Sequence, residues 1–195
     1  YFFTATPKYT RSAENNRGMN NKKVFGNTLI NVPAPELVKN GLILSPKLNV
    51  YDREEERNKE NASDIDRDVV LDILDDIHED TNAKVLVSAP NTRILWSMLA
   101  QTDIITELKS RDYDIMHITA KHGAYINRQK VRRDKFFDTL SQWGEDDDKK
   151  FILFHYSILS EGINVRGLTH SVLLRNLPVI EMAQTIGRVI RLHKY

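Results

Sequence analysis

The residues best suited to chemistry lie near the end of the chain, in the segment QTIGRVIR at residues 184–191. At about 100° per residue along a helix, Gln184, Arg188 and Arg191 fall on one narrow stripe. The opposite stripe is apolar and consists of Val179, Ala183, Ile186, Val189 and Ile190. Planar guanidinium groups bind phosphate oxygens through paired hydrogen bonds. The pattern predicts a helix that packs through its apolar stripe and presents a phosphate-binding stripe, although an amphipathic helix with solvated arginines has the same spacing.

A second candidate element precedes this helix. The apolar run at residues 151–154 predicts a buried strand, and it opens into a loop that carries SEGIN at residues 160–164. Gly162 in this loop allows a ligand or another backbone to approach closely. Two more short motifs end apolar strands, TATP at residues 4–7 and SAPN at residues 88–91. Each is weak alone, so any functional meaning depends on their order.

The four segments TATP, SAPN, SEGIN and QTIGRVIR follow one another in the order and spacing of motifs III, IV, V and VI of the superfamily 2 helicases. The resemblance covers nearly the whole chain. Within the superfamily the chain looks most like the branch with phage UvsW-type helicases and the motor subunits of restriction enzymes. Residues 24–48 are similar to the stretch that follows motif III in that branch. The resemblance implies an ATP-dependent DNA helicase or translocase.

Roles for individual residues follow from this resemblance. Arg188 and Arg191 would be catalytic and face the γ-phosphate of ATP, while Gln184 would contact the nucleotide or neighbouring motif residues. The nucleotide site would also include Gly162 and Asn164. Many members have Asp where this chain has Asn164, so a ribose contact there is in doubt. The hydroxyls of Thr4 and Thr6 would couple ATP hydrolysis to nucleic-acid binding.

Candidates for nucleic-acid binding are polar residues in loops at the expected carboxyl edge of the sheet. Hydroxyls, amides and single lysines at such an edge can hold a phosphate backbone without reading its sequence. The set is Asn91, Thr119, Lys121, His122, Ser157 and Ser160. Each of them could instead satisfy only a local turn. The partner expected from the resemblance is DNA, single-stranded or branched, with RNA as the alternative.

Composition limits the function classes. The 195 residues carry 28 basic and 27 acidic side chains, so any contact with a polyanion must come from a local surface. Cysteine is absent, which excludes disulfides and thiolate metal sites. No signal peptide or long apolar run is present, so we expect a cytoplasmic protein, in the host cytoplasm if a phage encodes it. The histidines show no metal-ligand spacing, and we expect no metal site in this segment.

The order of elements predicts an α/β fold, a parallel sheet with helices on both faces. The helicase resemblance implies that this sheet is RecA-like, with the end of a truncated first lobe at residues 1–50, a charged linker at residues 51–62 and the second lobe at residues 63–195. In detail, the sequence predicts a strand at residues 27–32, a helix at residues 34–40, N-caps at Ser63 and Asn91, and strands near residues 84–88, 113–118, 150–155 and 170–174. A helix is expected at residues 128–143.

The chain lacks two parts of an ATPase. No glycine is followed by lysine, as a phosphate-binding loop requires, and no Asp-Glu pair is present to hold magnesium. We therefore expect the segment alone to be inactive, with ATP and Mg²⁺ bound mainly by an N-terminal lobe that this chain does not contain. The alternatives are the motor subunit of a restriction system and a binding module for nucleic acid that has kept the fold without catalysis.

Overall fold

A computed structural model describes residues 9–10, 18–156, 165–177 and 179–190. The predicted α/β class is confirmed, with a six-stranded sheet in the order β4-β3-β2-β5-β1-β6. The strands are β1 (Lys84–Ser88), β2 (Asp114–Thr119), β3 (Gly123–Ile126), β4 (Gln129–Val131), β5 (Phe151–His155) and β6 (His170–Leu173). The four strands β2, β5, β1 and β6 are parallel, as expected. The hairpin of β3 and β4 adds an antiparallel edge that the sequence did not predict.

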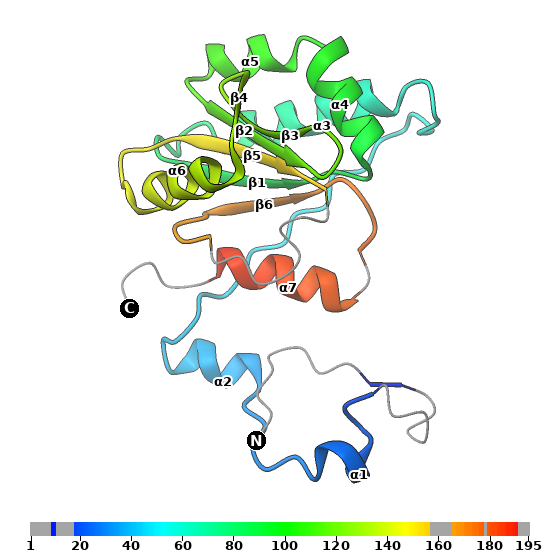
Figure 1. Ribbon diagram of the computed structural model, residues 1–195, viewed down its shortest axis with the longest axis vertical. Helices are drawn as coiled ribbons and strands as arrows, with labels where there is room; N and C mark the ends of the chain where they lie inside the picture. The colour runs from blue at the N-terminus through cyan, green and yellow to red at the C-terminus, as the bar shows by residue number, and fades with distance from the viewer. Residues whose placement is uncertain (1–8, 11–17, 157–164, 178, 191–195) are drawn as a thin grey trace.

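Helices cover both faces of the sheet (Figure 1). Those of the main body are α3 (Ala62–Asp76), α4 (Thr92–Gln101), α5 (Ile104–Ser110), α6 (Arg133–Glu145) and α7 (Val179–Val189). One core lies between the sheet and α3, α4 and α5, with Leu74, Leu95 and Leu108 among its buried side chains. The other core lies beneath α6, where Phe136 and Leu140 are buried. Strands β1 and β5 are buried at every residue, which explains the apolar runs at residues 85–87 and 151–154 within them.

Several predicted boundaries were wrong. Residues 27–32 form no strand and are exposed, because strand formation requires a neighbouring strand for its backbone hydrogen bonds. Helix α3 begins one residue after its N-cap Asn61, so Ser63 lies inside the helix. Helix α6 begins at Arg133, because the preceding residues form the hairpin. The short helix α5 was not predicted.

The N-terminal segment lies away from the sheet (Figure 1). It contains α1 (Lys22–Phe25) and α2 (Ala34–Lys39), and Gly41 after α2 has the positive φ of 67° expected at a helix end. One backbone hydrogen bond of 2.9 Å, from Leu44 N–H to Ile190 C=O, connects this segment to the end of α7. Large apolar side chains of the N-terminal segment are exposed, with Ile30 at 81% and Leu48 at 80%.

The predicted linker, residues 51–62, is mostly exposed and contains no regular helix or strand before Ala62, where α3 begins. Ion pairs hold it on α3. Arg57 donates two hydrogen bonds, of 3.0 and 2.8 Å, to the two carboxylate oxygens of Asp66. The side chain of Asp66 is 4% exposed. Burial raises the pKa of Asp66, and the charge and hydrogen bonds of Arg57 oppose that shift. A second pair, Arg53 with Asp72, is more exposed.

We predict that Arg57→Ala loosens the linker and destabilises α3. Removing Arg57 leaves the buried Asp66 carboxylate without these hydrogen bonds, which costs roughly 1–3 kcal/mol. A glutamate-specific protease should then cut the linker at Glu54–Glu56 faster than in wild type. Arg53→Ala is the matched control, because its exposed pair contributes little. Equal cleavage rates and melting temperatures for both variants would contradict the anchoring role of Arg57.

A pair of glycines in helices gives a second test of the packing. A Cβ on Gly144 in α6 would lie 2.4 Å from the backbone carbonyl oxygen of Arg166, whereas no described atom lies within 4 Å of a Cβ on Gly187 in α7. Gly187→Ala should raise the melting temperature, since alanine is favoured in a helix by about 1 kcal/mol. Gly144→Ala should lower it despite the same gain. If both substitutions shift the melting temperature in the same direction, the close approach of Gly144 to the Arg166 carbonyl is wrong.

Candidate functional site

The carboxyl ends of the parallel strands meet at one edge of the sheet. Ser88 at the end of β1 pairs in register with His155 at the end of β5, and Ile118 of β2 also pairs with His155. The loops after β1, β2 and β5 therefore leave the same edge, as the sequence predicted. In parallel α/β sheets this edge is where ligands bind.

A buried hydrogen bond joins two of these strand ends. Ser88 Oγ lies 3.0 Å from His155 Nε2, and both residues are at most 4% exposed. Burial and, to a smaller extent, the charges of Arg188 and Arg175 together lower the pKa of His155 to about 3. The imidazole is therefore neutral at pH 7. A neutral ring can lie beside two guanidinium groups without the repulsion that a cation would meet.

Helix α7 packs differently from the sequence prediction. Arg188 is only 6% exposed and Thr185 is 5% exposed, so these residues lie on the buried side of the helix. Ala183, expected in the apolar packed stripe, is exposed. Val189 packs against the core beneath α6, as expected of an apolar residue. Arg188 is therefore held within the fold near His155, rather than presented on a solvated face.

Arg175 adds a second cation to this region. It lies two residues after β6, is half-buried, and its guanidinium carbon is 5.0 Å from the centre of the Tyr156 ring. The charges of Arg175 and Arg188 both act on His155, which places positive charge from β6 and α7 at the carboxyl edge. Gln184, one turn before Arg188, is half-buried. Arginine stays charged when buried, so this arrangement favours an anion such as phosphate.

Seven of the predicted site residues lie outside the described residues. They are Thr4, Thr6, Ser157, Ser160, Gly162, Asn164 and Arg191. Four of them follow the described strand β5 closely in the sequence.

The described nucleic-acid candidates have defined local roles. Asn91 is the N-cap of α4, as the sequence predicted, and its side chain accepts a 2.9 Å hydrogen bond from Ile94 N–H. Thr119 is 2% exposed, and its hydroxyl accepts a 3.0 Å hydrogen bond from His122 N–H. Lys121 is exposed, whereas His122 is half-exposed and stacks on Trp96 with ring centres 4.2 Å apart. The first two residues shape turns, while Lys121 and His122 offer surface to a partner.

Sequence reasoning missed Arg175, Trp96 and Tyr125. The position of Arg175 directly after a buried strand was a usable signal, because that strand was predicted correctly. Trp96 lies within a helix, and Tyr125 belongs to the unpredicted hairpin. Their proximity depends on tertiary structure and had no local signal.

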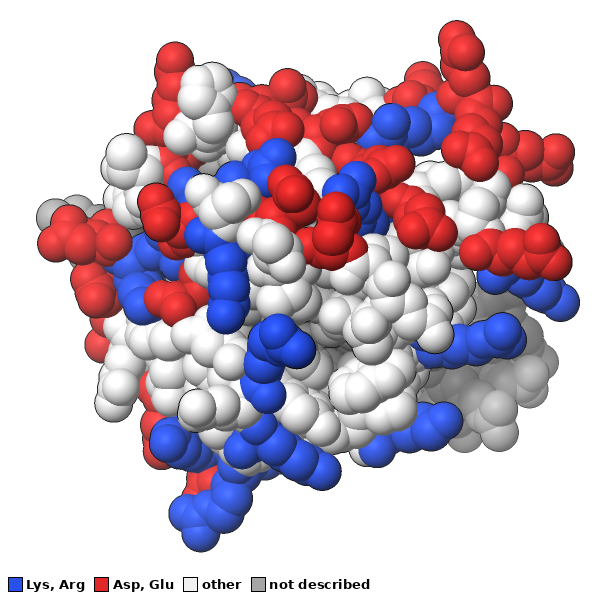
Figure 2. Space-filling view, turned by 90° about the horizontal axis from the view of Figure 1, so that it is seen from above, with Lys and Arg blue, Asp and Glu red and all other residues white. Residues whose placement is uncertain are grey.

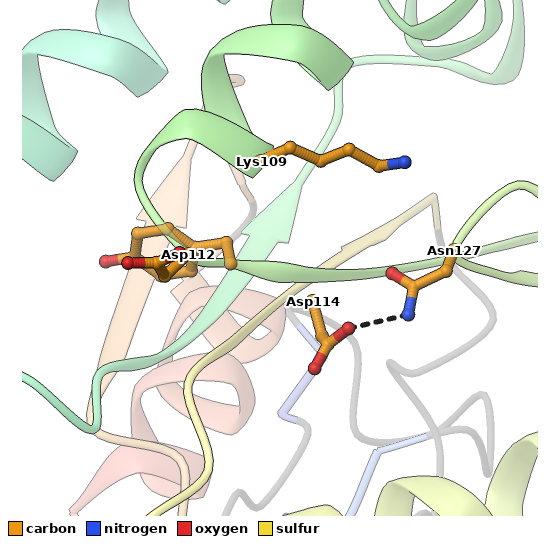
Figure 3. A pocket seen from close by; sticks show the side chains of 5 residues that line it. Lys109, Asp112, Asp114 and Asn127 are labelled. Atoms are coloured by element: carbon orange, nitrogen blue, oxygen red, sulfur yellow. Dashed lines mark hydrogen bonds between the residues drawn. The ribbon is translucent and has the colours of Figure 1, made fainter.

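A hollow of about 350 Å³ lies at the other end of the sheet, near the start of β2 (Figure 3). Lys109, Asp112, Tyr113, Asp114 and Asn127 line it. Asn127 donates a 2.6 Å hydrogen bond to Asp114, which also pairs with Lys149. The side chains of Asn127, Asp114 and Lys149 thus bind one another rather than converge on the hollow. We therefore place the candidate site at the carboxyl edge. Within the described ranges, no group of three His, Asp or Glu residues is arranged to hold a metal ion.

Comparison with known proteins supports the fold. No model of a known protein family matches the sequence, and no curated protein matches it. Among solved structures, the chain is similar to the ATP-dependent Type ISP restriction-modification enzyme LlaBIII bound to DNA. The TM-score is 0.57 with 14% sequence identity, and the match covers 96% of this chain. It covers only 14% of that enzyme's chain. At this identity the similarity shows a shared fold, that of a RecA-like lobe.

None of the helices in the described part of the chain is both long enough and apolar enough to cross a membrane.

The buried histidine gives a pH-dependent prediction. Since the folded-state pKa of His155 is depressed below its unfolded value of 6.5, unfolding takes up a proton between about pH 6.5 and pH 3. The stability that His155 contributes is complete above pH 6.5 and is lost as the pH falls through this window. His155→Gln can retain a hydrogen bond to Ser88 but cannot titrate. The stability advantage of wild type over His155→Gln should shrink by roughly 2 kcal/mol between pH 7 and pH 4.5. Denaturant unfolding at both pH values measures it, and a constant difference would contradict a neutral buried imidazole.

Proposed function

We propose that the chain is the C-terminal motor lobe of an ATP-dependent DNA helicase or translocase. In this proposal Arg188 and Arg191 contact ATP that an N-terminal lobe holds, and Gln184, Gly162 and Asn164 complete the nucleotide contacts of this lobe. The observation that carries the proposal is the placement of Arg188 beside the carboxyl edge of a RecA-like sheet, where its charge acts on His155. Thr4 and Thr6 would couple hydrolysis to DNA binding.

The chemistry of phosphoryl transfer explains the value of this placement. Negative charge spreads over the equatorial oxygens of the transferred group, and an arginine that meets it can accelerate hydrolysis by about 10³ to 10⁵. A buried guanidinium has few accessible conformations, so little entropy is lost when it binds phosphate. The hydrogen bond between Ser88 and His155 would keep the ends of β1 and β5 in place beside Arg188, whose charge acts on His155.

A second lobe would account for the exposed apolar surface of the N-terminal segment. Leu29, Ile30, Leu48 and Val50 are each at least 75% exposed, and such apolar exposure on a single segment is typical of a protein interface. We propose that residues 1–50 complete a first RecA-like lobe, that residues 51–62 connect the lobes, and that residues 63–195 form the second lobe. Mg²⁺ would be bound by the first lobe, because the chain contains no Asp-Glu pair.

DNA is the proposed partner, since LlaBIII is described as bound to DNA. Its name also favours one alternative, the motor of a restriction-modification system, in which the same lobe would translocate DNA while a nuclease acts elsewhere. A binding module without catalysis is the third candidate. The retention of Gln184 and Arg188 in the expected spacing favours a motor over that module.

The kinetic test uses the full-length protein. Arg188→Ala and Arg191→Ala should each lower kcat for ATP hydrolysis by at least about a hundredfold, with little change in KM, because the arginines act on charge that develops in the transition state. Arg188→Lys and Arg191→Lys should recover only part of the loss, because an ammonium lacks the planar fork. The isolated 195-residue chain should hydrolyse no ATP.

A matched control separates catalysis from folding. Arg166→Ala removes an arginine whose side chain is 59% exposed and should leave kcat unchanged. Because Arg188 is buried, the melting temperature of its variants must be measured beside kcat. If Arg188→Lys and Arg191→Ala keep wild-type kcat and change only thermal stability, the arginines are structural and the proposal fails.

A further inference from the structure

Positive charge is concentrated on one segment of this nearly neutral chain. Residues 121–135 contain six basic residues and one acidic residue, whereas the net charge of the whole chain is +1. All six basic residues are exposed: Lys121, Arg128, Lys130, Arg132, Arg133 and Lys135. The acidic residue, Asp134, pairs with Arg132 at 2.8 Å. Figure 2 shows basic side chains gathered along the lower part of the molecule and acidic side chains along the upper part.

The β3–β4 hairpin orders part of this charge. Asn127 and Arg128 have φ values of 47° and 70°, which form a tight turn and place Arg128 at its tip. Lys130 pairs in register with Tyr125, so the two side chains lie on the same face of the hairpin. A Cβ on Gly123 would lie 3.5 Å from Lys130 Cε, which shows that the lysine side chain lies over the first residue of β3.

Aromatic rings lie on the same face. His122 stacks on Trp96 with ring centres 4.2 Å apart and an interplanar angle of 14°. Tyr125 stacks on His117 at 4.6 Å and 13°, and its ring centre is 6.0 Å from that of Trp96. His117 is 7% exposed and supports Tyr125 from within. The other three residues are half-exposed, so part of this aromatic cluster reaches solvent.

We propose that this hairpin surface binds single-stranded nucleic acid, with unpaired bases stacking on its rings and phosphates contacting its cations. The hairpin surface consists of Trp96, Lys121, His122, Tyr125, Arg128 and Lys130. Ordered rings beside lysines and arginines are the combination that single-strand-binding proteins use. A duplex keeps its bases paired and would use only the cations, and an acidic protein would need no exposed rings. The assignment rests on the proposed function for the choice of DNA as the nucleic acid.

The first experiment reverses the charge. In the 195-residue chain, the triple variant Lys121→Glu, Arg128→Glu, Lys130→Glu should raise the Kd for fluorescein-labelled oligo(dT) by at least about tenfold and reduce the salt dependence of binding, since each lost phosphate contact removes about 0.7 from the slope of log K against log salt. The matched control is Lys39→Glu, Lys47→Glu, Lys59→Glu, which makes the same change of charge at three exposed lysines elsewhere. Equal effects of the two triples would show that only net charge matters and would overturn the proposal.

The second experiment tests stacking. With Trp143→Phe as background, Trp96 is the remaining tryptophan. Oligo(dT) should quench its fluorescence, and His122→Ala should weaken binding of oligo(dT) about tenfold while binding of duplex DNA changes little. Polyglutamate serves as the protein-like polyanion. If it binds as tightly as oligo(dT), or if His122→Ala has no effect, the surface is a general polyanion or acidic-protein site and base stacking is wrong.

A third measurement separates this proposal from the function of the motor. In the full-length protein, the hairpin triple variant should need at least about tenfold more single-stranded DNA than wild type for half-maximal stimulation of ATP hydrolysis. If wild type hydrolyses ATP but the variant responds to DNA as wild type does, the hairpin proposal alone fails. If wild type hydrolyses no ATP, the proposed function fails, and the oligo(dT) measurements still decide whether the hairpin surface binds single strands.

Discussion

The parallel pairing of β1 with β5 is the constraint on which the other features of the candidate site depend. Every residue of both strands is buried, so a shift in their register would expose apolar side chains and separate Ser88 from His155. This register brings three loops to one edge. It also fixes His155 as a neutral group beside Arg175 and Arg188. Core packing and the electrostatics of the candidate site are thus set by the same pair of strands.

The chain as a whole is nearly neutral, but its basic and acidic side chains gather in different places. Buried arginine lies near the carboxyl edge, exposed lysine and arginine follow the hairpin, and acidic residues crowd the linker and α3. A partner that carries phosphates would be attracted to two surfaces of different character. The carboxyl edge holds a buried guanidinium in place, which suits a reacting phosphate. The hairpin surface is open to solvent and carries aromatic rings, which suits a nucleic-acid strand.

The sequence was sufficient for the parts of the fold that have a strong local signal. The strands at residues 84–88 and 151–155 were predictable as short, continuous apolar runs, and Asn91 was recognisable as an N-cap. The hairpin was missed because its strands are short and its turn, Asn127-Arg128, lacks the usual glycine. Arg188 was assigned to an exposed phosphate-binding stripe because helical periodicity separates polar from apolar residues, whereas the tertiary fold buries this polar residue near His155. Contacts between residues far apart in the sequence, such as Trp96 and His122, are set by the tertiary fold and leave no periodic pattern in the sequence.

The central claim is that the carboxyl edge of this sheet, with Arg188 beside it, forms one wall of an ATP site. Hydrogen–deuterium exchange of the full-length protein, with and without ADP and aluminium fluoride as a mimic of the transferred phosphate, tests it most directly. We predict slower exchange in the peptides that contain α7 and the end of β5, because bound nucleotide would hold both against the opposing lobe. Slower exchange confined to other parts of the protein, with α7 and β5 unchanged under saturating nucleotide, would contradict the claim.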